Sequence, residues 1–191
     1  EQMERADAAQ RIRRQVNTFD DMTKEVIAFA RGDRRVIKQK VALTDFLSQF
    51  EEATIPEYES AEMSLEIQLV DTKFGYFDAK RMLRVLTNVA RNARQAMDPG
   101  GRFDVSVSTA KDGGLVFELT DNGPGVPDGI KDRLFDLFTT AGKSDGTGLG
   151  LAIVKRIVDD HGGKIKFTSN EGLGTSFKIW LPPYVNEVDD A

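Results

Sequence analysis

The chain has 191 residues, of which 40% are apolar and 30% charged, as in a globular protein with one good-sized domain and an appendage. Its formal net charge of −5 argues against a dedicated nucleic-acid binder, and the absence of cysteine excludes disulfides and thiolate metal sites. The single histidine, His161, makes a zinc site improbable. No apolar run is long enough to cross a bilayer and no signal peptide is visible, so we expect a cytoplasmic location. Because the first residue is Glu1 rather than Met, we expect a piece of a longer protein, whose full length can carry a membrane anchor.

The first 31 residues are highly charged and carry a narrow apolar stripe with heptad-like spacing. This pattern predicts a long helix that pairs with another helix or another chain; packing on the domain's own core is the alternative. The stripe consists of Ile12, Val16, Phe19, Met22, Val26 and Phe29.

The next segments mix charge, short apolar runs and one proline. Residues 34–40 are expected to form a basic connector, and Pro56 marks a loop over residues 51–60. The expected elements here are a short helix over 43–50 and strands over 65–70 and 74–77.

From Asp78 onward the elements are more regular. Asp78 is a predicted helix N-cap, because a carboxylate there can accept a hydrogen bond from a free backbone N–H. The expected elements are a helix over 79–97, a hairpin of 103–107 and 115–120 joined by a turn at 111–114, a helix over 151–158, and strands over 164–169 and 175–181. This order predicts an α+β fold: a two-layer α/β sandwich whose mixed, mainly antiparallel sheet is covered by helices on one face, preceded by a long N-terminal helix.

Two glycine-rich loops lie close together, at 121–125 and 146–150. Glycine lets backbone N–H groups approach a ligand, and a helix N-terminus favours negative charge, so a phosphate-bearing ligand is expected. The known phosphate motifs do not fit: a P-loop ending at Ser144 lacks its first glycine, because position 137 is Leu, and no dinucleotide fingerprint can be placed. The His-Arg-Asp and Asp-Phe-Gly sequences of eukaryotic-type protein kinases are also absent.

Four sequence blocks occur in order: 88–93 (Asn-Val-Ala-Arg-Asn-Ala), 121–127 (Asp-Asn-Gly-Pro-Gly-Val-Pro), 134–140 (Leu-Phe-Asp-Leu-Phe-Thr-Thr) and 146–154 (Gly-Thr-Gly-Leu-Gly-Leu-Ala-Ile-Val). Together they resemble the N, G1, F and G2 boxes of the ATP-binding domain of bacterial sensor histidine kinases, in the wider family shared with DNA gyrase, the Hsp90 chaperones and MutL. The resemblance covers about residues 62–183 and implies ATP and Mg²⁺ as ligands. It assigns the nucleotide to Asn88, Asn92, Asp121, Gly123, Gly125, Lys143, Gly146, Thr147, Gly148, Leu149, Gly150 and Thr175, and the metal to Asn92.

Each assigned role has a chemical reason. A carboxylate at Asp121 can accept a hydrogen bond from the exocyclic amine of adenine, whereas guanine presents an oxygen there. Mg²⁺ keeps waters and phosphate oxygens, so the side-chain oxygen of Asn92 is a sufficient protein ligand. Phe135 and Phe138 are expected to pack the root of a lid over the phosphates, and His161 is expected to have a structural role at a helix end.

The resemblance implies that the chain transfers the γ-phosphoryl of ATP to a protein histidine for relay to a response regulator receiver domain. Members that hydrolyse ATP carry a Glu four residues before the metal Asn, and that position here is Asn88, so transfer is favoured over hydrolysis. Residues 1–32 resemble the second helix of a dimerisation hairpin, and the helix with the acceptor histidine is not in the chain. The expected organisation is therefore an incomplete hairpin (1–32), a linker with a short helix (33–61), the ATP-binding domain (62–183) and an acidic tail (184–191), with a possible homodimer.

Two other functions remain open. The chain can be a nucleotide-dependent binding module without transferase activity, or a serine kinase of the anti-sigma-factor type, which shares the same boxes. The long apolar stripe argues against the serine kinase, because the helical hairpin belongs to sensor kinases.

Overall fold

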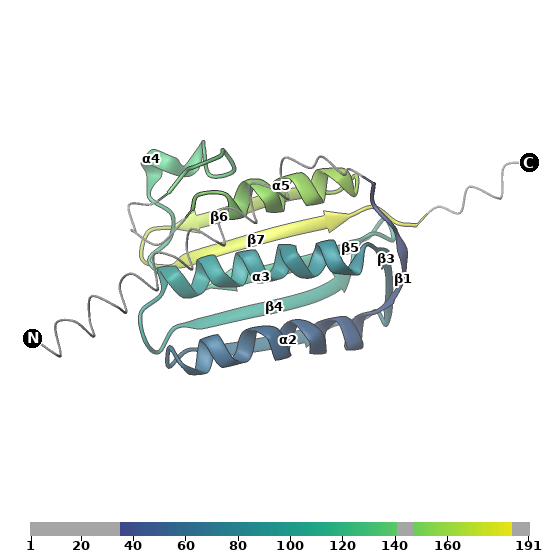
Figure 1. The fold of residues 1–191 in the computed structure, drawn as a ribbon, viewed down its shortest axis with the longest axis horizontal. Helices are drawn as coiled ribbons and strands as arrows, with labels where there is room; N and C mark the ends of the chain where they lie inside the picture. The colour runs from purple at the N-terminus through teal and green to yellow at the C-terminus, as the bar shows by residue number, and fades with distance from the viewer. Residues whose placement is uncertain (1–34, 141–146, 185–191) are drawn as a thin grey trace, which may run out of the picture.

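We describe a computed structural model of the chain, which covers residues 35–140 and 147–184. In these ranges a five-stranded sheet and a separate two-stranded sheet are packed with helices (Figure 1). The strands are β1 (Gln39–Ala42), β2 (Ser64–Leu69), β3 (Phe74–Phe77), β4 (Arg102–Thr109), β5 (Leu115–Asp121), β6 (Lys164–Asn170) and β7 (Gly174–Leu181). The helices are α2 (Leu43–Glu59), α3 (Ala79–Ala96), α4 (Asp128–Lys131) and α5 (Gly150–Asp160).

The large sheet has the strand order β2-β4-β5-β7-β6. Only the β2–β4 pair is parallel, and the other neighbours are antiparallel. Helices α2, α3 and α5 lie side by side across one face (Figure 1). The expected α+β sandwich with a mixed, mainly antiparallel sheet is confirmed; the predicted helix over 1–31 lies outside the described residues.

The core lies between the sheet and these three helices. Along β5 the buried residues alternate with more exposed ones, so that Phe117 and Leu119 face the helices. Along α3 the apolar residues recur at helical spacing and form the facing layer: Met82, Val85, Leu86, Val89, Ala90 and Ala93. The other face of the sheet carries mostly polar side chains.

Helix α2 differs from the prediction. The helix was expected to end at Phe50 and to be followed by a loop, but it continues to Glu59 with Pro56 inside it. Proline costs the hydrogen bond that its missing N–H would make. Tyr58, in the same final turn, is fully buried, donates its hydroxyl to the Ala90 carbonyl at 2.7 Å and contacts the Phe103 ring. This burial offsets the cost of the proline and holds the last turn on the core.

Strand β1 was also not predicted, because a basic connector was expected there. Residues 39–42 pair antiparallel with β3. Val41 is buried and the neighbouring Lys40 lies with its ammonium 4.4 Å from the Phe74 ring centre. With only one buried apolar side chain in four residues, the strand has almost no alternation by which sequence can reveal it.

The β4–β5 hairpin closes with a tight turn, as predicted. Ala110 donates its N–H to the Gly114 carbonyl, and Asp112 accepts hydrogen bonds from the Gly114 N–H and from the Trp180 indole at 3.2 Å. The Lys164 ammonium lies 5.5 Å from the Trp180 ring centre. The last strand is thereby attached to this turn.

Helix α5 ends in a Schellman motif that involves His161 and the two glycines after it. Gly162 has φ +73°, the Gly163 N–H bonds to the Val158 carbonyl and the Gly162 N–H bonds to the Asp159 carbonyl. The predicted helix-end role of His161 is confirmed.

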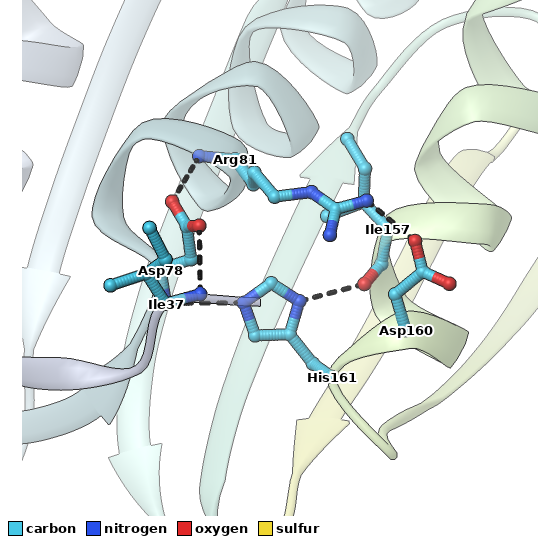
Figure 2. A network of polar contacts seen from close by, with 6 residues as sticks. All are labelled: Ile37, Asp78, Arg81, Ile157, Asp160 and His161. Atoms are coloured by element: carbon cyan, nitrogen blue, oxygen red, sulfur yellow. Dashed lines mark hydrogen bonds and ion pairs between the residues drawn. The ribbon is translucent and has the colours of Figure 1, made fainter. Parts of the chain in front are cut away.

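The His161 ring joins α5 to the start of α3 (Figure 2). Its Nδ1 donates to the Ile157 carbonyl at 2.7 Å, so its Nε2 is the atom that accepts the Asp78 N–H at 3.1 Å. Asp78 caps α3 as predicted, with Oδ1 accepting the Arg81 N–H, while Oδ2 accepts the Ile37 N–H. One imidazole and one carboxylate therefore hold together two helix ends and the segment before β1.

A second contact at this junction, the ion pair of Arg81 and Asp160, bridges α3 and α5 at 2.5 Å (Figure 2). Burial lowers the pKa of His161, and the nearby positive charges of Arg81 and Lys38 lower it further, against the opposing effects of the Ile157 carbonyl and Asp78. The neutral ring that the geometry requires is thus also the favoured charge state.

Candidate functional site

Asp121 lies at the end of β5 on the helix-covered face of the sheet. It continues the inward-facing series of Phe117 and Leu119, and only 7% of its surface is exposed. Its Oδ1 accepts the N–H groups of Gly123 at 2.9 Å and Thr175 at 3.2 Å. None of the described residues bonds to its Oδ2, which remains available to a ligand.

The electrostatics of Asp121 favour a donor ligand. Burial raises the pKa of its carboxyl above the ordinary value of 3.8, although the two backbone N–H groups oppose this effect. The buried Asp121 carboxylate therefore loses solvation free energy in its charged form. A ligand N–H on Oδ2 would offset this cost.

The loop after Asp121 is attached to the turn between β6 and β7. The Gly172 N–H bonds to the Pro124 carbonyl at 2.9 Å. Gly125 has φ +81°, and a Cβ there would lie 2.5 Å from the Asn170 carbonyl oxygen, so only glycine allows this approach. The glycines at 123 and 125 thus shape the loop beside Asp121 through their backbones.

The two amides of α3 lie one helical turn apart and face the start of α5. A Cβ placed at Gly150 would lie 3.8 Å from Asn92 Oδ1 and 3.9 Å from Asn88 Cγ. Asn88 is 8% exposed, and its buried Nδ2 has no hydrogen-bond partner among residues 35–140 and 147–184. A buried unpaired donor is costly, and a phosphate oxygen would satisfy it.

The second glycine loop contacts the end of the Phe-rich block through its backbone. The Phe138 N–H bonds to the Gly148 carbonyl at 2.9 Å, and a Cβ at Gly148, whose φ is +67°, would lie 2.5 Å from the Phe138 carbonyl carbon. Leu149 is buried, and its N–H bonds to the Thr147 hydroxyl at 3.3 Å. This contact fixes the chain immediately before α5.

The prediction for the two phenylalanines is half right. Phe135 packs against Phe167 and Phe177, with ring centres 5.9 and 6.4 Å away. The Phe138 side chain was expected to pack as well, but it is 61% exposed, because its positive φ of 64° turns the chain toward Gly148. Phe138 contacts the second glycine loop through its backbone.

The structure brings the described predicted residues together in two groups. One consists of Asp121, Gly123, Gly125 and Thr175, and the other of Asn88, Asn92, Thr147, Gly148, Leu149 and Gly150. Lys143 and Gly146 lie outside the described residues. Sequence reasoning missed Ser169, whose hydroxyl contacts Val126, Gly174 and Thr175. A serine near the end of an exposed strand gives no signal by which to find it.

A divalent cation can bind at this site only if most of its ligands are water molecules or phosphate oxygens. Among residues 35–140 and 147–184 no three His, Cys, Asp or Glu residues form a metal cluster. One amide oxygen from Asn92 beside an unpaired donor on Asn88 suits Mg²⁺ that is carried in by phosphates, because Mg²⁺ takes few protein ligands.

A family profile described as "Histidine kinase-, DNA gyrase B-, and HSP90-like ATPase" matches residues 77–185. The chain belongs to this ATPase family. The profile spans Asp121, both amides of α3 and the start of α5, which are the residues that form the site.

The chain is also similar to curated bacterial sensor proteins. Sensor histidine kinase ZraS of Salmonella typhimurium is 35% identical over 153 residues, which are 79% of this chain and 32% of ZraS. Alginate biosynthesis sensor protein KinB of Pseudomonas aeruginosa is 30% identical over 182 residues, or 93% of this chain and 30% of KinB. The chain thus spans about a third of the length of these relatives.

The chain is also similar to a solved structure that contains a bound nucleotide analogue. Full-length ShkA in complex with AMPPNP has a TM-score of 0.75 and 27% identity, over 85% of this chain and 35% of ShkA. Sequence and structure therefore both place the chain beside the ATPase domain of histidine kinases. No helix in the described part of the chain is long and apolar enough to span a membrane.

Proposed function

We propose that the chain is the ATP-binding catalytic part of a sensor histidine kinase. It transfers the γ-phosphoryl group of Mg-ATP to a histidine on a helix of the same or a partner kinase, for relay to a response regulator receiver domain. The observation that carries this proposal is the buried Asp121, with one oxygen held by two backbone N–H groups and the other available. Family membership supports the kinase assignment, because the relatives are sensor kinases.

In this proposal adenine lies at Asp121, and its amine donates to Oδ2. The phosphates lie toward Gly150 and the Asn88 amide, whose Nδ2 donor has no partner in the part of the chain that the structure describes. Asn92 holds Mg²⁺, which neutralises phosphate charge when bound. Thr147, Gly148 and Leu149, with Lys143 and Gly146, belong to the lid over the phosphates. The complex of ShkA with AMPPNP is consistent with a nucleotide at such a site.

Transfer is proposed rather than fast hydrolysis, because Asn88 occupies the position that carries Glu in hydrolysing members. An amide cannot take a proton from water, and in place of the Glu base Asn88 offers a hydrogen-bond donor. The site therefore binds and orients the nucleotide, and the attacking group comes from the acceptor histidine. We propose residues 1–32 as the second helix of the hairpin that presents this histidine and makes a homodimer.

A binding experiment tests the nucleotide assignment. Thermal unfolding is measured with ATP, ADP and GTP, each with and without Mg²⁺. We expect stabilisation by adenine nucleotides alone, by about 2.7 kcal/mol at a ligand concentration 100 times Kd. Equal stabilisation by GTP would contradict the assignment of the base to Asp121.

A transfer experiment tests the reaction. The chain is mixed with labelled ATP and with a separately made helical hairpin that carries the acceptor histidine. Acid-labile label on the hairpin is expected. Acid-stable label on a serine would support the anti-sigma-factor type of kinase, and ATP binding without any transfer would support a nucleotide-dependent binding module.

A further inference from the structure

Ser169 belongs to a row of polar side chains that crosses three strands at one end of the sheet. The strand register places Ser169 opposite Thr175, and Thr175 opposite Asp121. All three continue the helix-facing series of their strands, so their side chains are neighbours on the covered face. We refer to Ser169, Thr175 and Asp121 as the polar row.

The Ser169 hydroxyl makes three hydrogen bonds. It accepts the Val126 N–H at 2.7 Å, it donates to the Gly174 carbonyl at 3.1 Å, and it lies 3.2 Å from the Thr175 hydroxyl. These partners come from the loop after Asp121 and from the start of β7. One hydroxyl therefore holds together the two segments that flank the proposed adenine position.

The proton count of these hydroxyl groups fixes the direction of the bond to Thr175. A serine hydroxyl has one proton, and here it goes to the Gly174 carbonyl, which can only accept. Thr175 must therefore donate its own proton to Ser169, and its oxygen keeps only lone pairs for other contacts. Its N–H is already bonded to Asp121 Oδ1.

Within the described residues, the side-chain atoms of Asp121 and Thr175 that remain for a ligand are then hydrogen-bond acceptors. Asp121 contributes Oδ2, and Thr175 contributes the lone pairs of its Oγ1. A purine with an amine at position 6 can donate a hydrogen bond to these acceptors. A purine with an oxygen at position 6 places a second acceptor against them, which is unfavourable.

We propose that Ser169 is a positioning residue that determines base specificity: its hydroxyl orients the Thr175 proton away from the ligand and attaches the Val126 loop to the sheet, so that 6-amino purines are preferred over 6-oxo purines. This inference rests on the proposed nucleotide function. It adds a residue that acts through Thr175 and the loop and does not itself touch the base.

The test compares two serines that lie on opposite faces of the sheet, Ser169 on β6 and Ser176 on β7. Ser169→Ala removes the hydroxyl of the polar row. Ser176→Ala is the matched control, because Ser176 makes a 2.8 Å hydroxyl pair with Thr120 on the opposite face of the sheet. Dissociation constants for Mg-ATP and Mg-GTP are measured by calorimetry, and the unfolding temperature is measured beside them.

We expect Ser169→Ala to reduce the preference for ATP over GTP about tenfold, as for the loss of one or two hydrogen bonds. Ser176→Ala should keep the parental preference even where its unfolding temperature falls. Ser169→Thr, which keeps a hydroxyl, should keep the parental preference for ATP. Ser169→Val, which has the shape of threonine but no hydroxyl, should lose it. If the alanine variant does not fold, the comparison of these two variants tests the proposal.

Two outcomes have distinct meanings. If the parent binds ATP selectively and the variants without a Ser169 hydroxyl bind both nucleotides as the parent does, this inference is overturned and the proposed function stands. If the parent itself binds no ATP, the proposed function fails and the inference fails with it.

Discussion

Asp121 has one oxygen that holds the fold and a second oxygen that is proposed to bind the ligand. One oxygen is bonded to the Gly123 and Thr175 N–H groups, and the other is available. In Asp121→Asn the remaining oxygen can keep both backbone bonds, while the new NH₂ group presents a donor to the adenine amine. We expect loss of ATP binding by at least about a hundredfold, from one lost and one repulsive contact, with a nearly unchanged unfolding temperature. Calorimetry and thermal unfolding check this, and parental ATP affinity in the variant would contradict the adenine assignment.

Asn88 is expected to contribute to nucleotide binding at a cost to the stability of the nucleotide-free protein. Its buried Nδ2 has no partner in the described structure, so its burial costs free energy without a ligand. Asn88→Ala should unfold at the parental temperature or slightly above it when no nucleotide is present. The stabilisation by Mg-ATP should fall, because a donor to the phosphates is lost. A variant that is strongly destabilised and still binds ATP like the parent would show that Asn88 is purely structural.

At the scale of elements, the α3–α5 pair is held at the end opposite the amides by Arg81 and Asp160. These side chains are 21% and 10% exposed, whereas the pair of Lys155 and Asp159 within α5 is 42% and 49% exposed. We expect Arg81→Ala to lower the free energy of unfolding by about 1–2 kcal/mol, and Lys155→Ala to lower it by less than about 0.5 kcal/mol. Urea unfolding of both variants checks this difference, and equal effects would contradict a bridging role.

The same junction gives a pH dependence. Because the folded state lowers the pKa of His161 below its ordinary value of 6.5, the unfolded chain binds a proton more readily. The contribution of His161 to stability is therefore complete above about pH 6.5 and is lost as the pH falls below that value. His161 is the only histidine of the chain, so His161→Gln, which keeps an acceptor for the Asp78 N–H, should remove this step from a series of unfolding curves between pH 7 and 5. A step that persists in the variant would assign it to another group.

Some elements could be predicted from sequence and others could not, for identifiable reasons. The α3 helix has a capping Asp78 and a regular apolar face, and both are local signals. The last turns of α2 depend on Tyr58 reaching Ala90, a contact across 32 positions that overrides the local effect of Pro56. In the candidate site, Asp121 and the α3 amides could be proposed from sequence because they stand in recognisable blocks, whereas the proposed role of Ser169 depends on strand register.

At the scale of the whole molecule, the core extends beyond the segment that the sequence blocks mark. Leu43, Phe46, Phe50 and Tyr58 of α2 are at most 2% exposed and belong to the same core cluster as α3 and β5. A chain that begins at residue 62 would lose these four side chains, each worth about 1.5–3 kcal/mol, which together match the whole stability of a typical domain. We expect it to be unfolded by circular dichroism, whereas a chain that begins at residue 35 should fold. A stable product from the shorter version would show that α2 is dispensable.

Trp180 sits near the end of β7, bonded to the β4–β5 turn and covered by the Lys164 ammonium. It is five positions along the strand from Thr175, or roughly 17 Å at the rise of an extended chain. As the only tryptophan in the chain, it supplies an intrinsic fluorescence reporter that needs no label. Its emission should shift to the red when the sheet comes apart, yet stay at the same wavelength when a ligand occupies the remote end, so loss of structure and ligand uptake can be followed as separate optical events.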